Sequence, residues 1–204
     1  MNVFIVRHGN TFLPNSKVTR VGVKTDISLV DSGISQAHEL GLYFSNKKIF
    51  FDKIYCSSLL RTAETAQIIR NYQIKKLNIE IKLLFDEIDH GEDEGKTDLE
   101  IVNRIGSKAL VDWENYGIAP RGWIVNEEIR ILGWKNFLRN HVEYNNVLIV
   151  TSNGAARFVF KVINVAGKIE SLKLRTGAFG VITQKSEMEK IELVNWNLLP
   201  KDLG

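Results

Sequence analysis

Cysteine is almost absent from this chain of 204 residues, which has a single one, Cys56. One cysteine cannot form an internal disulfide, so the chain is not a small secreted domain built on disulfides. A reducing compartment fits this composition. The apolar segment before Arg7 is short and lacks the basic region of a signal peptide. We therefore expect a cytoplasmic protein.

Long apolar runs and blocks of one charge are also missing. No stretch approaches the roughly 18 apolar residues of a transmembrane helix, so we expect no membrane partner. The formal net charge is +3 and the basic residues are dispersed, which argues against a nucleic-acid partner. Carboxylates and histidines lack metal-ligand spacing, and we expect no metal or other cofactor. Without repeats or linkers, 1–204 is expected to be a single domain.

What the sequence does have is an alternation of short apolar runs with segments of helical periodicity. The apolar runs predict strands at 3–6, 54–56, 79–85 and 147–150, and the periodic segments predict helices at 32–47, 60–72, 126–144 and 154–166. Near the C-terminus, strands at 178–183 and 190–194 are predicted to form a hairpin around the polar turn 184–189. This order predicts a three-layer α/β/α sandwich with a mostly parallel, mixed central sheet.

Residues 96–124 are the least regular part of the chain. They are helical in places, with Gly106 and Gly117 as breaks. We expect this segment to form a cap near a ligand site.

Polar residues follow each of the four predicted parallel strands. In chain order these segments are RHGNT from Arg7, SSLLRTAETA from Ser57, FDEIDHGEDEGKT from Phe85 and VTSNGAAR from Val150. Ligands of open α/β sheets bind beyond the carboxyl ends of the strands, so the four segments are expected to meet there.

The chemistry of these segments indicates a phosphate site. The guanidiniums of Arg7 and Arg61 can each bind a tetrahedral oxyanion through two N–H groups, and nearby helix starts offer free backbone N–H groups. Among these positive charges the imidazole of His8 should stay neutral, and a neutral imidazole can attack phosphorus. Glu87 is the candidate acid and base, with Asp89 as the nearest alternative.

The segments FIVRHGNT, GVKTDISLVDSGISQA, YCSSLLRTAETA, EIDHGEDEGKT and VLIVTSNGAAR resemble, in order, the motifs of the histidine phosphatase superfamily, which includes the cofactor-dependent phosphoglycerate mutases. The resemblance covers about three-quarters of the chain, and the first and third of these segments are the most specific. It implies a phosphoglycerate mutase-like fold, a phosphorylated histidine at His8, a phosphate clamp of Arg7 and Arg61, and proton donation by Glu87.

The chain departs from the family pattern after the fourth strand, where Ser152 stands in place of a second histidine. A serine contact carries no charge, and losing a charge-assisted contact to a transition state costs on the order of 2–4 kcal/mol. Ser152 is still expected to contact phosphate, with an N-cap as the alternative. Asn153 and His90 are candidates for making up the loss. Asp93 replaces a tryptophan of the family's third motif.

Asn10 and Thr11 complete the predicted phosphate site, with a plain turn as the alternative. Together these residues predict a metal-independent phosphatase acting on a small phosphorylated metabolite. The alternatives are a phosphoglycerate-type mutase and a phospholigand-binding protein whose catalysis is weakened by Ser152. The sequence leaves the substrate and the oligomeric state open, a homodimer included.

Overall fold

The structure, a computed structural model, describes residues 1–164, 171–186 and 190–203, and these contain one six-stranded sheet of order β3-β2-β4-β1-β5-β6. The strands are β1 (Asn2–Arg7), β2 (Lys53–Cys56), β3 (Ile79–Ile81), β4 (Asn146–Thr151), β5 (Phe179–Thr183) and β6 (Glu192–Leu198). Strands β1 to β4 pair in parallel, whereas β5 is antiparallel to both β1 and β6. The expected mostly parallel, mixed sheet is confirmed.

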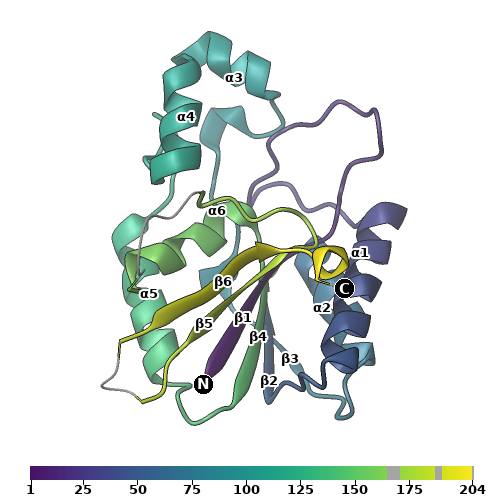
Figure 1. The fold of residues 1–204 in the computed structure, drawn as a ribbon. Coiled ribbons are helices and arrows are strands. Elements are labelled where there is room, and N and C mark those ends of the chain that lie inside the picture. Colours follow the sequence, from purple (N-terminus) through teal and green to yellow (C-terminus); the bar gives the residue numbers. More distant parts are fainter. Residues whose placement is uncertain (165–170, 187–189, 204) are drawn as a thin grey trace.

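Helices cover both faces of the sheet (Figure 1). The helices of the described residues are α1 (Asp31–Asn46), α2 (Leu60–Asn71), α3 (Asp98–Ile105), α4 (Ser107–Tyr116), α5 (Glu127–Arg139) and α6 (Asn153–Ala156). In β1, Phe4 and Val6 join the core under α1 and α2, while Val3 and Ile5 join the core under α5. This alternation produces the predicted three-layer sandwich. Among the described residues, no helix is both long and apolar enough to span a membrane.

The predicted strand 79–85 is too long. It ends as β3 at Ile81, and Leu83–Phe85 form a 3-10 turn. The turn buries Phe85 in the core, where its carbonyl accepts a hydrogen bond of 2.6 Å from the Thr151 hydroxyl of β4. The following residues are thereby brought to the carboxyl edge of the sheet.

Two predicted helices are also too long. The segment predicted at 154–166 is divided into α6 and a 3-10 turn, Arg157–Lys161, and Asn164 already pairs with the backbone of Ile191. Residues 165 and 166 of that prediction lie outside the described part. The helix predicted at 126–144 ends at Arg139, because the chain must turn to enter β4.

The second strand of the C-terminal hairpin is β6, which begins and ends later in the chain than the predicted strand 190–194. The ring of Trp196 in β6 packs on Phe160 with centroids 4.6 Å apart, and its Nε1–H donates to the Lys173 carbonyl at 3.1 Å. These contacts extend the strand toward Leu198. Of the predicted turn 184–189, residues 187–189 lie outside the described part.

Two short helices, α3 and α4, stand beyond the carboxyl end of the sheet (Figure 1). Thr97 and Glu100 form a reciprocal capping box that starts α3. Gly106 has φ of 82° between the helices, and Gly117 has φ of 70° after α4, so both breaks lie where the sequence predicts them. The cap function of 96–124 stays a prediction.

Candidate active site

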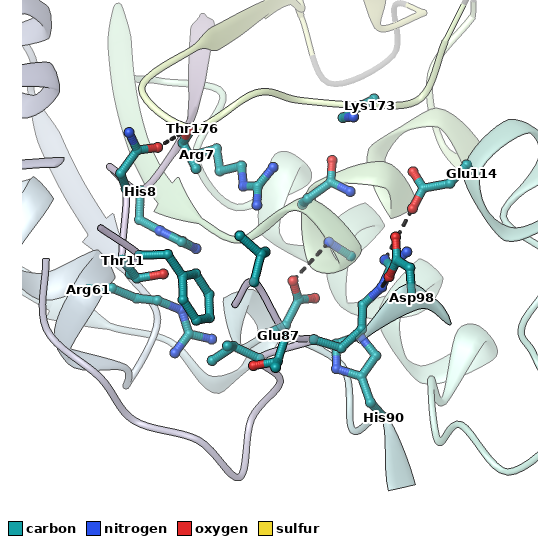
Figure 2. A pocket seen from close by; sticks show the side chains of 18 of the residues that line it. Arg7, His8, Thr11, Arg61, Glu87, His90, Asp98, Glu114, Lys173 and Thr176 are labelled. Carbon is teal, nitrogen blue, oxygen red and sulfur yellow. Dashed lines mark hydrogen bonds and ion pairs between the residues drawn. The ribbon is translucent and has the colours of Figure 1, made fainter. Parts of the chain in front are cut away.

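The carboxyl ends of the central strands open into a cavity of about 1040 Å³. Eight of the nine predicted site residues line it, namely Arg7, His8, Asn10, Thr11, Arg61, Glu87, His90 and Asn153. Figure 2 labels Arg7, His8, Thr11, Arg61, Glu87 and His90 among the side chains around the cavity. The convergence of the four segments at one edge of the sheet is therefore confirmed.

His8 follows β1 and is almost fully buried, with 5% of its surface exposed. Its backbone N–H donates to the Thr151 carbonyl of β4, and its Nδ1 lies 2.8 Å from the Gly9 carbonyl. A carbonyl can only accept, so Nδ1 carries the hydrogen and Nε2 keeps its lone pair. Burial, and then the charges of Arg7 and Arg61, hold the pKa of His8 well below 6.5.

The two arginines are held by backbone carbonyls. Arg7 donates from Nη1 to the Leu174 carbonyl at 2.9 Å, and burial lowers its pKa to about 10. Arg61, in the first turn of α2, donates from Nη1 to Thr25 and from Nη2 to Gly22, at 2.8 and 3.1 Å. A guanidinium has five N–H donors, so each arginine keeps donors for an anion in the cavity.

Glu87 is buried and fixed through both carboxylate oxygens. Oε1 accepts from the Ile88 N–H at 2.9 Å, and Oε2 accepts from the Gly154 N–H of α6 at 3.1 Å. A Cβ at Gly154 would lie 2.2 Å from Oε1, so any larger residue here would displace the Glu87 carboxylate. This contact ties the third predicted segment to the fourth.

Arg130 of α5 is a supporting residue that sequence reasoning missed. It donates to the carbonyls of Leu84, Asp86 and Glu87 at 3.2, 2.8 and 3.4 Å. Nothing in the local pattern marks it, because it lies in an ordinary helical segment and its partners are more than 40 residues away in the chain.

Asn10 is engaged by its own protein framework. Its Oδ1 accepts from the Thr176 hydroxyl at 2.5 Å, and its Nδ2 donates to the Ser32 hydroxyl at 3.2 Å. Thr11 lines the same cavity. The contacts of Asn10 show how the loop after β1 is held against α1 and the segment before β5. The phosphate contacts of Asn10 and Thr11 stay predictions.

Ser152 is the predicted residue that does not line the cavity. Its hydroxyl is fully buried and has no hydrogen-bond partner among the described residues. It occupies the N-cap position of α6, yet its side chain makes no cap bond. Asn153, the next residue, does line the cavity, and its Oδ1 accepts from the Leu174 N–H at 2.8 Å.

His90 lies at the cavity wall with a carboxylate behind it. Its Nδ1 is 3.5 Å from Oε2 of Glu94, and its ring meets the Trp123 ring edge-on at 4.5 Å. Burial raises the pKa of Glu94, but contacts with His90, Thr25 and the Gly22 amide outweigh it and hold that pKa at about 2. The carboxylate therefore stays ionised.

Asp93, which replaces the family's tryptophan, binds a tryptophan from elsewhere. Trp123 donates its indole N–H to Oδ2 of Asp93 at 2.8 Å. Arg104 of α3 donates to both carboxylate oxygens of Asp93. The aspartate is fully buried, and these contacts offset the cost of its burial. The departure at 93 thus has a structural partner at 123.

A neutral imidazole with a free lone pair, set near two guanidiniums and a carboxylate, has the groups that phosphoryl transfer uses. Among the described residues, no group of three or more histidine, cysteine, aspartate or glutamate side chains is arranged to hold a metal ion. The fold and cavity define an α/β protein with a cavity at the carboxyl edge of its sheet that is lined by several cationic side chains. A model of the histidine phosphatase superfamily (branch 1) matches residues 3–198, and the chain belongs to this superfamily.

Known proteins that resemble the chain include both mutases and phosphatases. The 2,3-bisphosphoglycerate-dependent phosphoglycerate mutase 2 of Bacteroides thetaiotaomicron is 25% identical over 120 residues, 58% of this chain and 48% of that protein. The chain thus spans about half the length of the curated relatives it matches.

Solved structures match over almost the whole chain. The α-ribazole phosphatase of Shigella flexneri has a TM-score of 0.76 at 21% identity, covering 97% of this chain and 96% of that one. A mycobacterial glucosyl-3-phosphoglycerate phosphatase has a TM-score of 0.76 at 17% identity, covering 97% and 99%. At these identities the likeness shows a shared fold.

Proposed function

We propose that the protein is a metal-independent phosphatase that hydrolyses a small phosphorylated metabolite through a phosphohistidine on His8. The observation that supports this most directly is the ring of His8, whose Nδ1–H is bonded to the Gly9 carbonyl while Nε2 has no hydrogen-bond partner among the described residues. The charges of Arg7 and Arg61 act on the same ring. A nucleophilic nitrogen beside two guanidiniums is what attack on a phosphoryl group requires.

The reaction would have two steps. In the first, Nε2 of His8 forms a bond to phosphorus, the bond to the ester oxygen breaks, and protonated Glu87 gives its proton to the departing oxygen. In the second, Glu87 takes a proton from water as the water oxygen attacks phosphorus. The N–P bond then breaks, which releases phosphate and restores neutral His8.

A trapping experiment tests this proposal. The protein is incubated with a radiolabelled phosphomonoester, quenched in base and digested, and the label is expected on the peptide with His8 as an acid-labile adduct. The variant His8→Asn should not incorporate label, whereas His38→Asn on the exposed side of α1 should behave as the wild type. Equal labelling of His8→Asn would rule the mechanism out.

The second candidate is a phosphoglycerate-type mutase, which the names of the curated relatives favour. A mutase must hold a bisphosphorylated intermediate, for which the cap segment offers Lys96, Arg104, Lys108 and Arg121. None of these four residues lines the cavity. Lys96 and Arg104 pair with Asp93, and Lys108 pairs with Asp112. Assaying the interconversion of 2- and 3-phosphoglycerate with and without the bisphosphate separates this candidate from a phosphatase.

The third candidate is a phospholigand-binding protein with weakened catalysis, which Ser152 favours. Tight binding of a phosphorylated ligand with no turnover across a broad panel of phosphorylated metabolites would support it. A large gain in activity in Ser152→His would point the same way.

A further inference from the structure

Four cationic side chains line the cavity, and three of them have partners. Arg7 and Arg61 donate to backbone carbonyls, and Arg20 is paired with Asp98 at 2.7 Å and with Glu114 at 3.1 Å. The fourth, Lys173, makes no side-chain hydrogen bond, ion pair or ring contact within the described residues. An ammonium group on a cavity wall without a carboxylate partner is available for an anion in that cavity.

The backbone that carries Lys173 is fixed against the phosphate site. On the C-terminal side, the Leu174 carbonyl accepts from Arg7 at 2.9 Å, and the Leu174 N–H donates to Asn153 at 2.8 Å. Lys173 itself donates its N–H to the Ser171 hydroxyl, and its carbonyl accepts from Trp196 of β6. The position of the lysine relative to Arg7 is thus set by residues of the cavity and of the sheet.

The surroundings of Lys173 favour an anion more than a cation. The Oδ1 of Asn153 is used by Leu174, which leaves its amide N–H groups as donors at the cavity wall. One acidic residue of the wall, Glu114, already faces two cations, Arg20 at 3.1 Å and Arg157 at 3.6 Å. In Figure 2, Lys173 and Arg61 lie on opposite sides of the cavity, with Arg7 and Glu87 between them.

The cavity is also larger than one phosphate requires. Its volume of about 1040 Å³ is at the upper end of that of small-molecule sites. Its wall also includes apolar side chains, among them Phe12, Leu110 and Val111. A substrate body can therefore extend along this wall from the phosphoryl group toward Lys173.

We propose that Lys173 is a specificity-determining residue that binds a second anionic group, a carboxylate or a second phosphate, on the substrate whose phosphoryl group lies at His8. The inference rests on the proposed function for the position of the phosphoryl group. Because Lys173 is exposed, its contribution is partly screened by solvent, and we expect a preference of about tenfold for substrates with the second anion.

Binding of phosphonates by calorimetry tests the subsite without any turnover. The probes are alkylphosphonates, ω-carboxyalkylphosphonates and alkane bisphosphonates with spacers of increasing length. The wild type should bind the best bifunctional probe about tenfold more tightly than the alkylphosphonate of equal length. In Lys173→Met this preference should disappear while affinity for alkylphosphonates is kept, and Lys75→Met, an exposed lysine after α2, should retain it.

Failure of the subsite proposal can be distinguished from failure of the proposed phosphatase function. Equal affinity for monofunctional and bifunctional probes at every spacer length would overturn the subsite, and so would equal loss for both classes in Lys173→Met. Whichever bifunctional class binds more tightly identifies the second anion as carboxylate or phosphate. Since phosphonates are not hydrolysed, a failed trapping of phosphohistidine would leave this measurement valid.

Discussion

The buried, neutral imidazole of His8 affects stability as well as chemistry. Burial and the charges of Arg7 and Arg61 keep its pKa well below 6.5, whereas in the unfolded chain it titrates at about 6.5. Between these two pKa values the unfolded state binds one more proton than the folded state. The free energy of unfolding therefore falls as pH decreases through this window, by about 1.4 kcal/mol per pH unit, and is unaffected above it.

The first prediction compares wild type with His8→Asn, which removes this titration. The difference in unfolding free energy between the two proteins should be constant near pH 7. Below about pH 6.5 the wild type should lose about 1.4 kcal/mol of unfolding free energy per pH unit relative to His8→Asn. Urea denaturation at about pH 7, 6 and 5 measures it. A difference that does not change with pH would show that His8 titrates alike in both states.

A second prediction concerns the buried hydroxyl of Ser152, which has no partner among the described residues. Removing an unsatisfied buried hydroxyl relieves a desolvation cost, so Ser152→Ala should leave stability unchanged or raise it by up to about 1 kcal/mol. Because Ser152 does not line the cavity, kcat/KM should change less than about threefold, as in the exposed control Ser35→Ala. A loss of tenfold or more would instead support the phosphate contact predicted from the sequence.

The elements that position the site could be predicted from the sequence to the extent that local patterns encode them. Uninterrupted apolar runs gave β1, β2 and β4, and the polar residues after them marked the cavity. The length of β3 could not be predicted, because the turn that buries Phe85 depends on Thr151, which is 66 residues away. The same holds for Arg130, whose carbonyl partners lie more than 40 residues away in the chain. The place of Lys173 at the cavity wall likewise depends on contacts with distant residues, such as the bond from the Trp196 indole to the Lys173 carbonyl.

Helix α5 holds the third segment in place, which gives the third prediction. Arg130→Met removes donors to the carbonyls of Asp86 and Glu87, leaving those buried acceptors unpaired. We expect a loss of about 2–3 kcal/mol in unfolding free energy. Because Glu87 then loses its fixed position, kcat should fall about tenfold or more while KM changes little.

The matched control for Arg130→Met is Lys135→Met, an exposed residue of the same helix. Denaturation and steady-state kinetics on one phosphomonoester measure both variants. A simple structural role predicts that the surviving folded enzyme keeps its kcat and its pH profile. A positioning role predicts a lower kcat and a changed pH profile, and an unchanged kcat in folded Arg130→Met would contradict it.

At the scale of the whole molecule, the helices beyond the sheet are joined to its core by a buried cation. Arg157 follows α6 and is 2% exposed, and its guanidinium lies 3.9 Å from the ring centroid of Trp113 in α4. It donates to the Trp113 carbonyl and lies 3.6 Å from Glu114, which also pairs with Arg20. Through this cluster α4, the loop after β1 and the end of β4 share one wall of the cavity.

The last prediction tests whether this cluster holds α4 against the sheet. Glu114→Gln leaves Arg157 as a buried cation that no described carboxylate faces at ion-pair distance, and removing one partner of a buried pair typically costs about 3–5 kcal/mol. Since Glu114 is partly exposed, we expect the free energy of unfolding to fall by about 2–3 kcal/mol. Amide hydrogen exchange in residues 98–116 should become faster. Glu128→Gln, at an exposed position, is the control. In the double variant Glu114→Gln/Arg157→Met the loss should be smaller than the sum of the single losses. Additive losses, with exchange in α4 unchanged, would mean that the two residues act independently.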